Sequence, residues 1–278
     1  MTESKLRHIW LVADDYGMSP AVSAAIRDLI ARARINATSV MAVAPSFSQA
    51  EAAALAAAAA SRAAIGLHLT LTAPFRPLSG GFAPTREGAF LPLAAMAGRA
   101  LAHLLKPEDL ELEISRQFAA FQAAFGRAPD FVDGHQHIHV FPQIRRTLLR
   151  VIKDVAPGAW LRQCGRSVAA RKSLVDPKGY VLDALSARLV RLARQHNVRT
   201  NPAFAGTYSF APGADFVKLF PGFLDGLPDG GLIMCHPGKV DAELRRLDPL
   251  TDLREREYEY FLDDDFPRLL AACGVALV

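Results

Sequence analysis

The sequence predicts an α/β fold, a single TIM-like (β/α) barrel or distorted barrel with about seven βα units. Short apolar runs alternate along the chain with segments in which apolar residues recur at helical spacing, which is typical of a parallel sheet covered by helices. The chain has 278 residues, of which 51% are hydrophobic, enough for one large domain with a buried core. Polar residues follow several of the apolar runs, as expected where an active site lies at the carboxyl ends of barrel strands.

The first part of the chain predicts three strands separated by two helices. The run at 9–13 is continuously apolar, as expected for a strand buried on both faces. Ser19 and Pro20 then begin a helix, as its N-cap and its first helical residue. Further strands are expected at 38–44 and 64–71, with an alanine-rich helix at about 49–62 between them.

Residues 73–106 interrupt this alternation and are rich in glycine and proline. A long irregular insertion in a compact domain is usually a functional loop or a lid, and we expect that role here, with a short helix at 93–105. No linker-like segment divides the chain. We therefore expect 1–278 to form one domain.

The rest of the chain resumes the alternation. Apolar residues at helical spacing predict a helix over 107–125, which Gly126 ends. The other helices are expected at 142–155, 181–195, 215–224 and 253–273, the strands at 160–162, 232–235 and 275–278, and loops at 200–210 and 239–252.

The overall charge is mild, with a formal net charge of +4. The arginines are scattered along predicted helices without a basic block, so we interpret them as solvated helix faces and expect no nucleic-acid binding. The three cysteines lie far apart and form no CxxC pair, which is typical of a reduced, cytoplasmic protein. We find no signal-peptide pattern and no 18-residue apolar stretch, and so expect no integral membrane segment. A homodimer is left open.

The segment 132–142 carries three of the eight histidines at every second position: His135, His137 and His139. On an extended segment the three imidazoles would share one face, with Asp133 in phase. Imidazole is the commonest protein ligand for metals, and a nearby carboxylate fixes its tautomer. Because catalytic metal sites tend to draw their ligands from different segments, we expect one or two of these histidines to bind metal. The others would orient the ligands or line the pocket.

Each of four separate apolar runs is followed by aspartate or histidine. The first is followed by the pair Asp14 and Asp15, and the others by His68, His135 and His236. One aspartate and two histidines make a divalent metal site with open positions, which can polarise a carbonyl and activate water. The second carboxylate could act as general base and His236 as general acid, which together give metal-assisted hydrolysis of an amide or ester. The alternative for the aspartate pair is an acidic signal ahead of a helix.

Four stretches resemble successive motifs of the YdjC-like carbohydrate deacetylases, a family that includes chitooligosaccharide deacetylases and the deacetylase of hopanoid biosynthesis. They are ADDYGMS at 13–19, GLH at 66–68, DGHQHIHVFP at 133–142 and HPG at 236–238, joined by RERE at 254–257. The resemblance covers nearly the whole chain and implies a distorted (β/α) barrel. It also implies a hydrolase that acts on a linear amide bond and removes an acetyl group from an N-acetylated sugar or glycolipid.

The resemblance also assigns roles, position by position. Asp15, His68 and His135 would hold one divalent metal ion, and Asp14 would be the base. His236 is our assignment for the acid. The family usually uses Mg²⁺, with Zn²⁺ as the second option. Ligand chemistry alone favours zinc, because imidazole suits transition metals and magnesium prefers oxygen.

Further positions would shape the site. His137 and His139 would form the pocket or support the ligands, and Arg162 would orient the substrate or Asp14. Tyr16 stands where phenylalanine is commoner in the family, and Gln136 interrupts what is often a longer histidine run. Both departures bear on the identity of the substrate.

Two other functions stay open at this point. One is a metal-dependent phosphoesterase. Two observations argue against it: the sequence offers ligands for only one metal, and it has no glycine-rich loop to bind phosphate. The other is a catalytically inactive protein that binds sugar or metal. The presence of a candidate base and a candidate acid beside the ligands argues against it.

Overall fold

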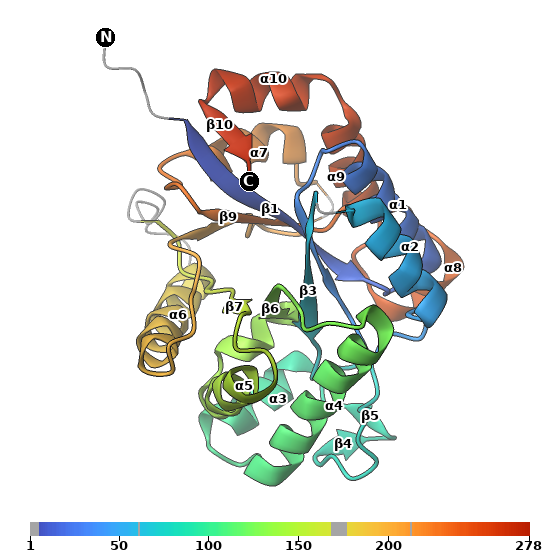
Figure 1. Cartoon of the computed structure of the whole chain (residues 1–278), viewed down its shortest axis with the longest axis vertical. Coiled ribbons are helices and arrows are strands. Elements are labelled where there is room, and N and C mark those ends of the chain that lie inside the picture. The colour runs from blue at the N-terminus through green and yellow to red at the C-terminus, as the bar shows by residue number, and fades with distance from the viewer. Residues whose placement is uncertain (1–5, 61, 168–176, 212) are drawn as a thin grey trace.

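A curled parallel sheet organises the molecule (Figure 1). The computed structural model describes residues 6–60, 62–167, 177–211 and 213–278. Seven strands follow one another across the sheet in the order β7-β6-β3-β2-β1-β9-β8, and all their pairings are parallel. In chain order these strands are β1 (Arg7–Tyr16), β2 (Ala37–Val40), β3 (Ala64–Leu69), β6 (Phe131–Gly134), β7 (Trp160–Leu161), β8 (Phe204–Ala205) and β9 (Leu232–Cys235).

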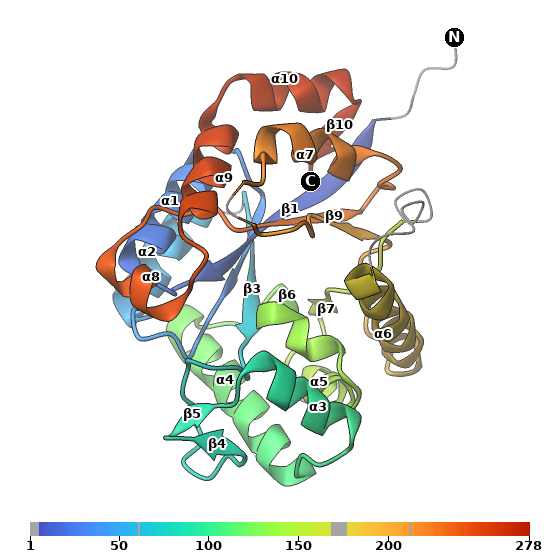
Figure 2. The same ribbon diagram turned by 180° about the vertical axis from the view of Figure 1, so that it is seen from behind.

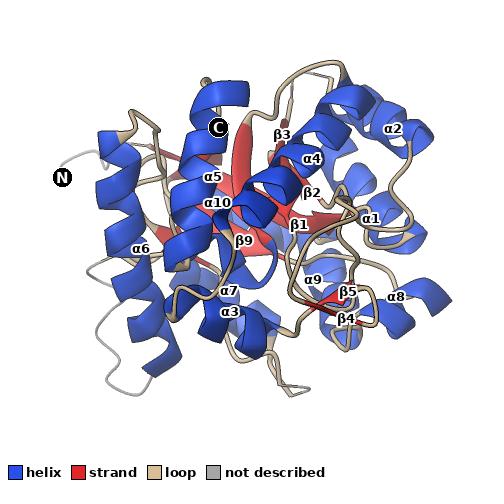
Figure 3. Ribbon diagram, turned by 90° about the horizontal axis from the view of Figure 1, so that it is seen from below, coloured by secondary structure: helices blue, strands red, loops and turns tan. Residues whose placement is uncertain are grey.

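Helices enclose the sheet, as Figures 2 and 3 show from two further sides. A last strand, β10 (Val275–Leu277), pairs with the first residues of β1 outside the main order. The predicted helix over 107–125 has those bounds in the structure. The α-helices are α1 (Pro20–Ala31), α2 (Gln49–Ala59), α3 (Leu93–Leu101), α4 (Pro107–Phe125), α5 (Pro142–Val155), α6 (Pro177–Gln195), α7 (Phe216–Leu224), α8 (Ala242–Leu247), α9 (Asp252–Leu262) and α10 (Asp265–Ala272).

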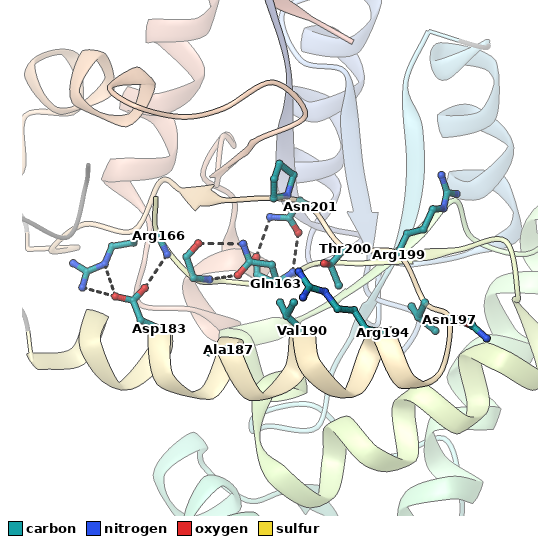
Figure 4. Close-up of a pocket in the computed structure, with 13 residues that line it drawn as sticks. Gln163, Arg166, Asp183, Ala187, Val190, Arg194, Asn197, Arg199, Thr200 and Asn201 are labelled. Carbon is teal, nitrogen blue, oxygen red and sulfur yellow. Dashed lines mark hydrogen bonds and ion pairs between the residues drawn. The ribbon is translucent and has the colours of Figure 1, made fainter. Parts of the chain in front are cut away.

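The sheet is a distorted barrel because its two edges barely meet. Between β7 and β8 the structure has two isolated parallel bridges, Leu161 with Thr200 and Arg166 with Phe204. A cavity of about 840 Å³ lies along this seam, under α6, where Gln163 and Asn201 hydrogen-bond to each other (Figure 4). The predicted α/β barrel is therefore confirmed, as a curled sheet of seven strands that is only partly closed.

Aromatic side chains fill the amino-terminal half of the barrel. The rings of Trp10 and Trp160 lie 5.6 Å apart, although three strands separate β1 from β7 in the sheet. Phe131 stacks on Trp160 at 4.5 Å, and Gly66 makes room for it, because a Cβ there would lie 2.5 Å from the Phe131 ring. We call Trp10, Phe131 and Trp160 the aromatic layer.

Ionisable side chains fill the carboxyl-terminal half of the same strands. Since side chains alternate along a strand, positions two or four residues beyond the aromatic layer and Gly66 face the same interior. We call these residues the polar layer: Asp14, His68, Asp133 and Arg162, all at most 2% exposed. The register places His68 directly beside Asp133 on neighbouring strands. The prediction that polar residues gather at the carboxyl ends of the strands is therefore confirmed.

The insertion at 73–106 contains a hairpin and a helix. The hairpin pairs β4 (Thr85–Arg86) with β5 (Ala89–Phe90), and the helix is α3. Buried Glu113 of α4 holds the start of the insertion by accepting hydrogen bonds from the backbone N–H groups of Leu78 and Ser79, at 3.2 and 2.8 Å. The insertion also sets the ring of Phe75 edge-on against His135, at 5.7 Å between centroids. A role as a lid or specificity loop stays a prediction.

Two predicted loops contain regular structure, and one predicted helix is divided in two. The expected loop at 239–252 contains α8, which begins where the Asp241 carboxylate accepts a hydrogen bond from the N–H of Leu244. The expected single helix at 253–273 is divided into α9 and α10, because Asp263 leaves the helical conformation at ψ 142°. The expected loop at 200–210 contains the two-residue strand β8, which is too short to leave a periodic pattern.

Within the part of the chain that the structure describes, no helix has both the length and the apolar character needed to cross a membrane.

Candidate metal centre and active site

A bulge in β1 turns both aspartates of the pair toward the barrel interior. The pairing of β1 with β2 shifts register between Ala13 and Tyr16, and Asp15 takes a left-handed conformation at φ 69°. A bulge re-aims side chains in this way, whereas a regular strand would point neighbours to opposite faces. Asp14 and Asp15 are consequently both buried among the groups of the polar layer.

Asp15 meets two histidines from distant parts of the chain. Its Oδ1 lies 3.2 Å from Nε2 of His68 and 3.0 Å from Nδ1 of His135. One ligand atom from each of the three residues lies within 4.8 Å of the others, as a shared cation requires. The structure thus brings together the three residues that the sequence predicted as ligands, and a carboxylate with two imidazoles fits a divalent metal.

Asp133 supports this group by fixing the orientation of His68. Nδ1 of His68 lies 2.7 Å from Oδ1 of Asp133, and since an ionised carboxylate only accepts, the imidazole must donate from Nδ1. Nε2 is left to face Asp15. A carboxylate behind a ligating histidine is the usual arrangement at metal sites. The sequence placed Asp133 in phase with its own histidine run, whereas the structure pairs it with His68 of the neighbouring strand.

Charge within the site is balanced by buried arginines and a proton. Burial would raise the pKa of Asp15, but Arg254 and His135 hold it well below its usual range. Burial would lower the pKa of His68, but Asp133 and Asp14 raise it to about 10. The carboxylates of the site therefore favour positive charge at its centre, which a divalent cation would supply.

Arg162 holds Asp14 from both oxygens. Its Nη1 and Nη2 donate to the two oxygens of Asp14 at 2.7 and 2.6 Å, and Nη2 also lies 2.5 Å from Oδ2 of Asp133. Asp14, His68 and Asp133 form a second group close enough for an ion. We favour the group of Asp15 as ligands, because Arg162 already engages both oxygens of Asp14. The expected contact between Arg162 and Asp14 is present.

The histidine run does not form the extended face that its spacing predicts. β6 ends at Gly134, and 135–140 forms a 3₁₀ turn in which Gln136 and His137 take left-handed conformations at φ 53° and 57°. Only His135 reaches Asp15. The chain folds back so tightly that a Cβ on Gly134 would lie 2.8 Å from Nδ1 of His139.

His137 and His139 lie on the other side of this turn, beside Cys164. Nε2 of His139 lies 3.0 Å from the carbonyl oxygen of Arg162, and Nδ1 of His137 lies 3.6 Å from Sγ of Cys164. Burial lowers the pKa of both imidazoles to about 3, with the charge of Arg162 adding to the effect. Both imidazoles are therefore neutral, and His139 contacts the backbone of Arg162.

His236 enters the site from the end of β9. Its backbone N–H donates to Oε2 of Glu257 at 2.5 Å, and its ring lies edge-on to Phe210 at 5.4 Å. Burial lowers the pKa of His236, while Asp15 and Asp14 raise it. Its Nδ1 is buried without a hydrogen-bond partner among the described residues.

Helix α9 contributes two residues to which the sequence reading gave no role. Arg254 is buried and donates to Oδ2 of Asp15 at 2.6 Å and to Asp248 at 2.5 Å. Glu257 accepts from the hydroxyl of Tyr208 at 2.6 Å, and burial raises its pKa to about 7. The two positions are three apart on a helix, so they share one face, and that spacing was a usable signal.

Several curated proteins are similar to this chain in sequence. The chain is 23% identical to a carbohydrate deacetylase of Clostridium beijerinckii, over 96% of each chain. It is 26% identical to a chitooligosaccharide deacetylase of Citrobacter koseri, over 84% of this chain and 82% of that protein. The match to a chitooligosaccharide deacetylase of Escherichia fergusonii is 30% identical, but spans 48% of this chain and 50% of that protein.

Solved structures confirm the architecture. A protein of Enterococcus faecalis, provisionally described as a cellobiose-phosphate cleavage protein, superposes with a TM-score of 0.75 at 22% identity, over 99% of this chain and 97% of that chain. A family 4 carbohydrate esterase (CE4) of Streptococcus mutans gives a TM-score of 0.53 at 11% identity, over 98% of this chain and 85% of that chain. At such identities these likenesses show the fold alone. The family model described as YdjC-like protein matches residues 8–272, and the chain therefore belongs to the YdjC-like family.

Proposed function

We propose that this protein is a metal-dependent hydrolase that removes an N-acetyl group from an amino sugar, carried on an oligosaccharide or a glycolipid. The observation that carries the proposal is the convergence of Asp15, His68 and His135 beside Asp14 and His236, from strand ends far apart in the sequence. The names of the relatives, carbohydrate and chitooligosaccharide deacetylases, support the acetylated sugar as substrate. The whole chain would act as one catalytic domain.

Asp15, His68 and His135 would hold the ion. A divalent cation bound there supplies Lewis-acid polarisation of the acetamide carbonyl. Two imidazoles favour Zn²⁺ on ligand chemistry, whereas the family resemblance favours Mg²⁺. Arg254 would keep the carboxylate of Asp15 ionised, and Asp133 would keep Nε2 of His68 directed toward the ion.

Asp14 would take the proton of the attacking water. Its carboxylate is held by two hydrogen bonds from Arg162, so its orientation is fixed before substrate arrives. It lies next to the ligand Asp15 in sequence and within the same polar layer. General-base catalysis by a positioned group contributes about 10²- to 10⁴-fold in rate.

His236 would pass a proton to the nitrogen of the departing amine. Its imidazole would make that transfer, and Glu257 fixes the backbone that carries it. Burial lowers the pKa of His236, so its protonated form would be a better proton donor than a free imidazolium. Water and amine would thus face different residues, Asp14 and His236.

The proposal is tested by measuring acetate release from N-acetylglucosamine oligomers and N-acetylated glycolipids. We expect EDTA to abolish release and either Mg²⁺ or Zn²⁺ to restore it. A parallel measurement of phosphate release from sugar phosphates tests the phosphoesterase alternative. Acetate release that survives thorough chelation would refute metal dependence, and release of phosphate without acetate would refute the deacetylase.

A further inference from the structure

The positive charge of the chain is concentrated in two segments. Residues 142–155 and 184–199 contain eight arginines and lysines and one aspartate, a net charge of +7. The whole chain carries +4, so the remaining residues together carry −3. Seven of the 25 arginines thus lie in α5, in most of α6 and in the short loop that follows α6, where a single aspartate offsets them.

These two helices are neighbours on the outside of the barrel (Figures 1 and 3). Arg146 of α5 and Arg188 and Arg191 of α6 are all exposed. Within the part of the chain that the structure describes, none of the three has a carboxylate partner. By contrast, Arg150, one helical turn beyond Arg146, pairs with Glu111 of α4. The face between α5 and α6 thus gathers like charges without the acidic partners found elsewhere on the surface.

Arg145 makes this face more than a solvated surface. The residue is only 4% exposed, whereas Arg146, Arg188 and Arg191 are exposed. Nη1 donates to the carbonyl oxygen of Val140 at 2.9 Å, but Nε is buried without a partner among the described residues. Burial lowers the pKa of Arg145, and the charges of Arg188, Arg146 and Arg191 lower it further, so these guanidinium groups are close enough to repel one another.

Such an arrangement costs stability unless an anion offsets it. Like charges on neighbouring helical positions repel, and a buried donor without an acceptor carries a desolvation penalty. Guanidinium groups match the oxygen geometry of phosphate, so several of them together favour a phosphate oxyanion over a chloride ion or a diffuse ion atmosphere.

We propose that Arg145, Arg146, Arg188 and Arg191 form a binding site for a phosphate group, on the outer face of the barrel between α5 and α6. The phosphate would be carried either by a soluble ligand or by the headgroup of an anionic lipid. The site uses none of the residues of the metal centre, and it holds whether or not the chain is a deacetylase.

The test compares the wild-type chain with the double variant R188A/R191A. Both arginines are exposed, so their removal leaves the core intact. The matched control is R32A/R268A, which removes the same charge from arginines that have acidic partners, Asp28 and Asp265. Binding of inorganic phosphate is measured by calorimetry. Binding to vesicles of phosphatidylcholine, with and without an equal part of phosphatidylglycerol, is measured by sedimentation at physiological salt.

We expect the wild type and the control to bind at least one of the two probes, and R188A/R191A to bind it far more weakly. For vesicles the loss should be about 30-fold, because each arginine near an anionic surface contributes about a factor of five. Phosphate binding alone would assign a soluble ligand, and vesicle binding alone would assign a lipid headgroup. Without either probe, R188A/R191A should melt at or above the temperature of the wild type, because two repelling charges have been removed.

Failure to bind either probe, or an equal loss of binding in both double variants, would overturn the proposal. A lower melting temperature of R188A/R191A would also contradict it, because the arginines would then stabilise the fold without a ligand. Acetate release by R188A/R191A on a soluble oligosaccharide should match that of the wild type. Measuring this activity distinguishes failure of the phosphate site from failure of the proposed deacetylase function.

Discussion

The two halves of the barrel interior use the same strands for opposite purposes. In the amino-terminal half, Trp10, Phe131 and Trp160 stack across the interior and close it. In the carboxyl-terminal half, positions two or four residues further along the same strands carry Asp14, Asp133 and Arg162. Burial of apolar surface in the aromatic layer stabilises the folded state, whereas desolvation of the charged groups in the polar layer destabilises it. The comparison indicates that the first half stabilises the fold, whereas the second half carries the groups that the proposed function needs.

The largest expected effect distinguishes two histidines of the same turn, one a proposed metal ligand and the other not. His135→Ala should lose bound metal and all measurable acetate release, because it removes one of three ligands. His137→Ala is the matched control from the same turn, and it should keep its metal, since that ring faces Cys164. Elemental analysis and acetate release on both variants check this. Retention of metal by His135→Ala, or its loss from His137→Ala, would reverse the two roles.

Asp14→Asn tests whether Asp14 acts as the general base and not as a metal ligand. We expect turnover to fall by about 10²- to 10⁴-fold, as for removal of a general base. Metal content should stay unchanged, because Asp14 does not belong to the favoured ligand group. Kinetics and elemental analysis on one preparation check this. Turnover at the wild-type rate would exclude Asp14 as base, and loss of the metal would point to the second group, Asp14 with His68 and Asp133.

Trp160→Ala should affect stability and leave metal binding unchanged, the reverse of the changes in the polar layer. Truncating this half-buried ring should lower the free energy of unfolding by about 3 kcal/mol, the lower end of the range for such changes. The folded fraction should still bind metal with wild-type stoichiometry. Urea denaturation followed by fluorescence measures the first, and elemental analysis the second. A stable variant that cannot bind metal would show that the two layers are not separable.

Gly66→Ala asks how tightly the aromatic layer is packed. A Cβ at this position would lie 2.5 Å from the ring of Phe131, and overpacking of this kind costs about 1–3 kcal/mol. Gly98→Ala in α3 is the control, because its Cβ would meet nothing within 4 Å and alanine favours helices by about 0.8–1 kcal/mol. Thermal unfolding of both variants should give shifts of opposite sign. Equal shifts would mean that Phe131 relaxes freely.

The smallest expected effect concerns Glu257, at the edge of the polar layer. Its pKa is raised from 4.5 to about 7, so the folded state binds a proton more tightly than the unfolded state does. The stability that this proton contributes is complete below about pH 4.5 and is lost as pH rises through 7. Glu257→Gln should therefore flatten the fall in unfolding free energy between pH 5 and pH 8. An unchanged slope in that interval would mean that Glu257 is ionised throughout.

The sequence predicted the strand ends well and the turn after β6 poorly, for a physical reason. Apolar runs ending in Asp or His located Asp14, Asp15, His68 and His236, because burial on both faces leaves a clear pattern. No pattern marks the left-handed conformations of Gln136 and His137, which tertiary contacts impose. An extended strand was therefore the natural but wrong expectation for that segment.

The contribution of α9 depended on packing that periodicity does not encode. The spacing of Arg254 and Glu257 puts them on one helix face. The local sequence does not indicate that this face contacts Asp15 and His236. The gathering of arginines between α5 and α6 was missed for the same reason. It depends on which two helices become neighbours around the barrel.

The central claim is that Asp15, His68 and His135 share one divalent ion. Crystals of metal-loaded protein, with anomalous diffraction recorded at the absorption edge of zinc, test it most directly. We predict one anomalous peak per chain, within about 2.0–2.2 Å of a ligand atom from each of the three residues. A loaded crystal without that peak, or a peak bound instead by Asp14, His68 and Asp133, would contradict the claim.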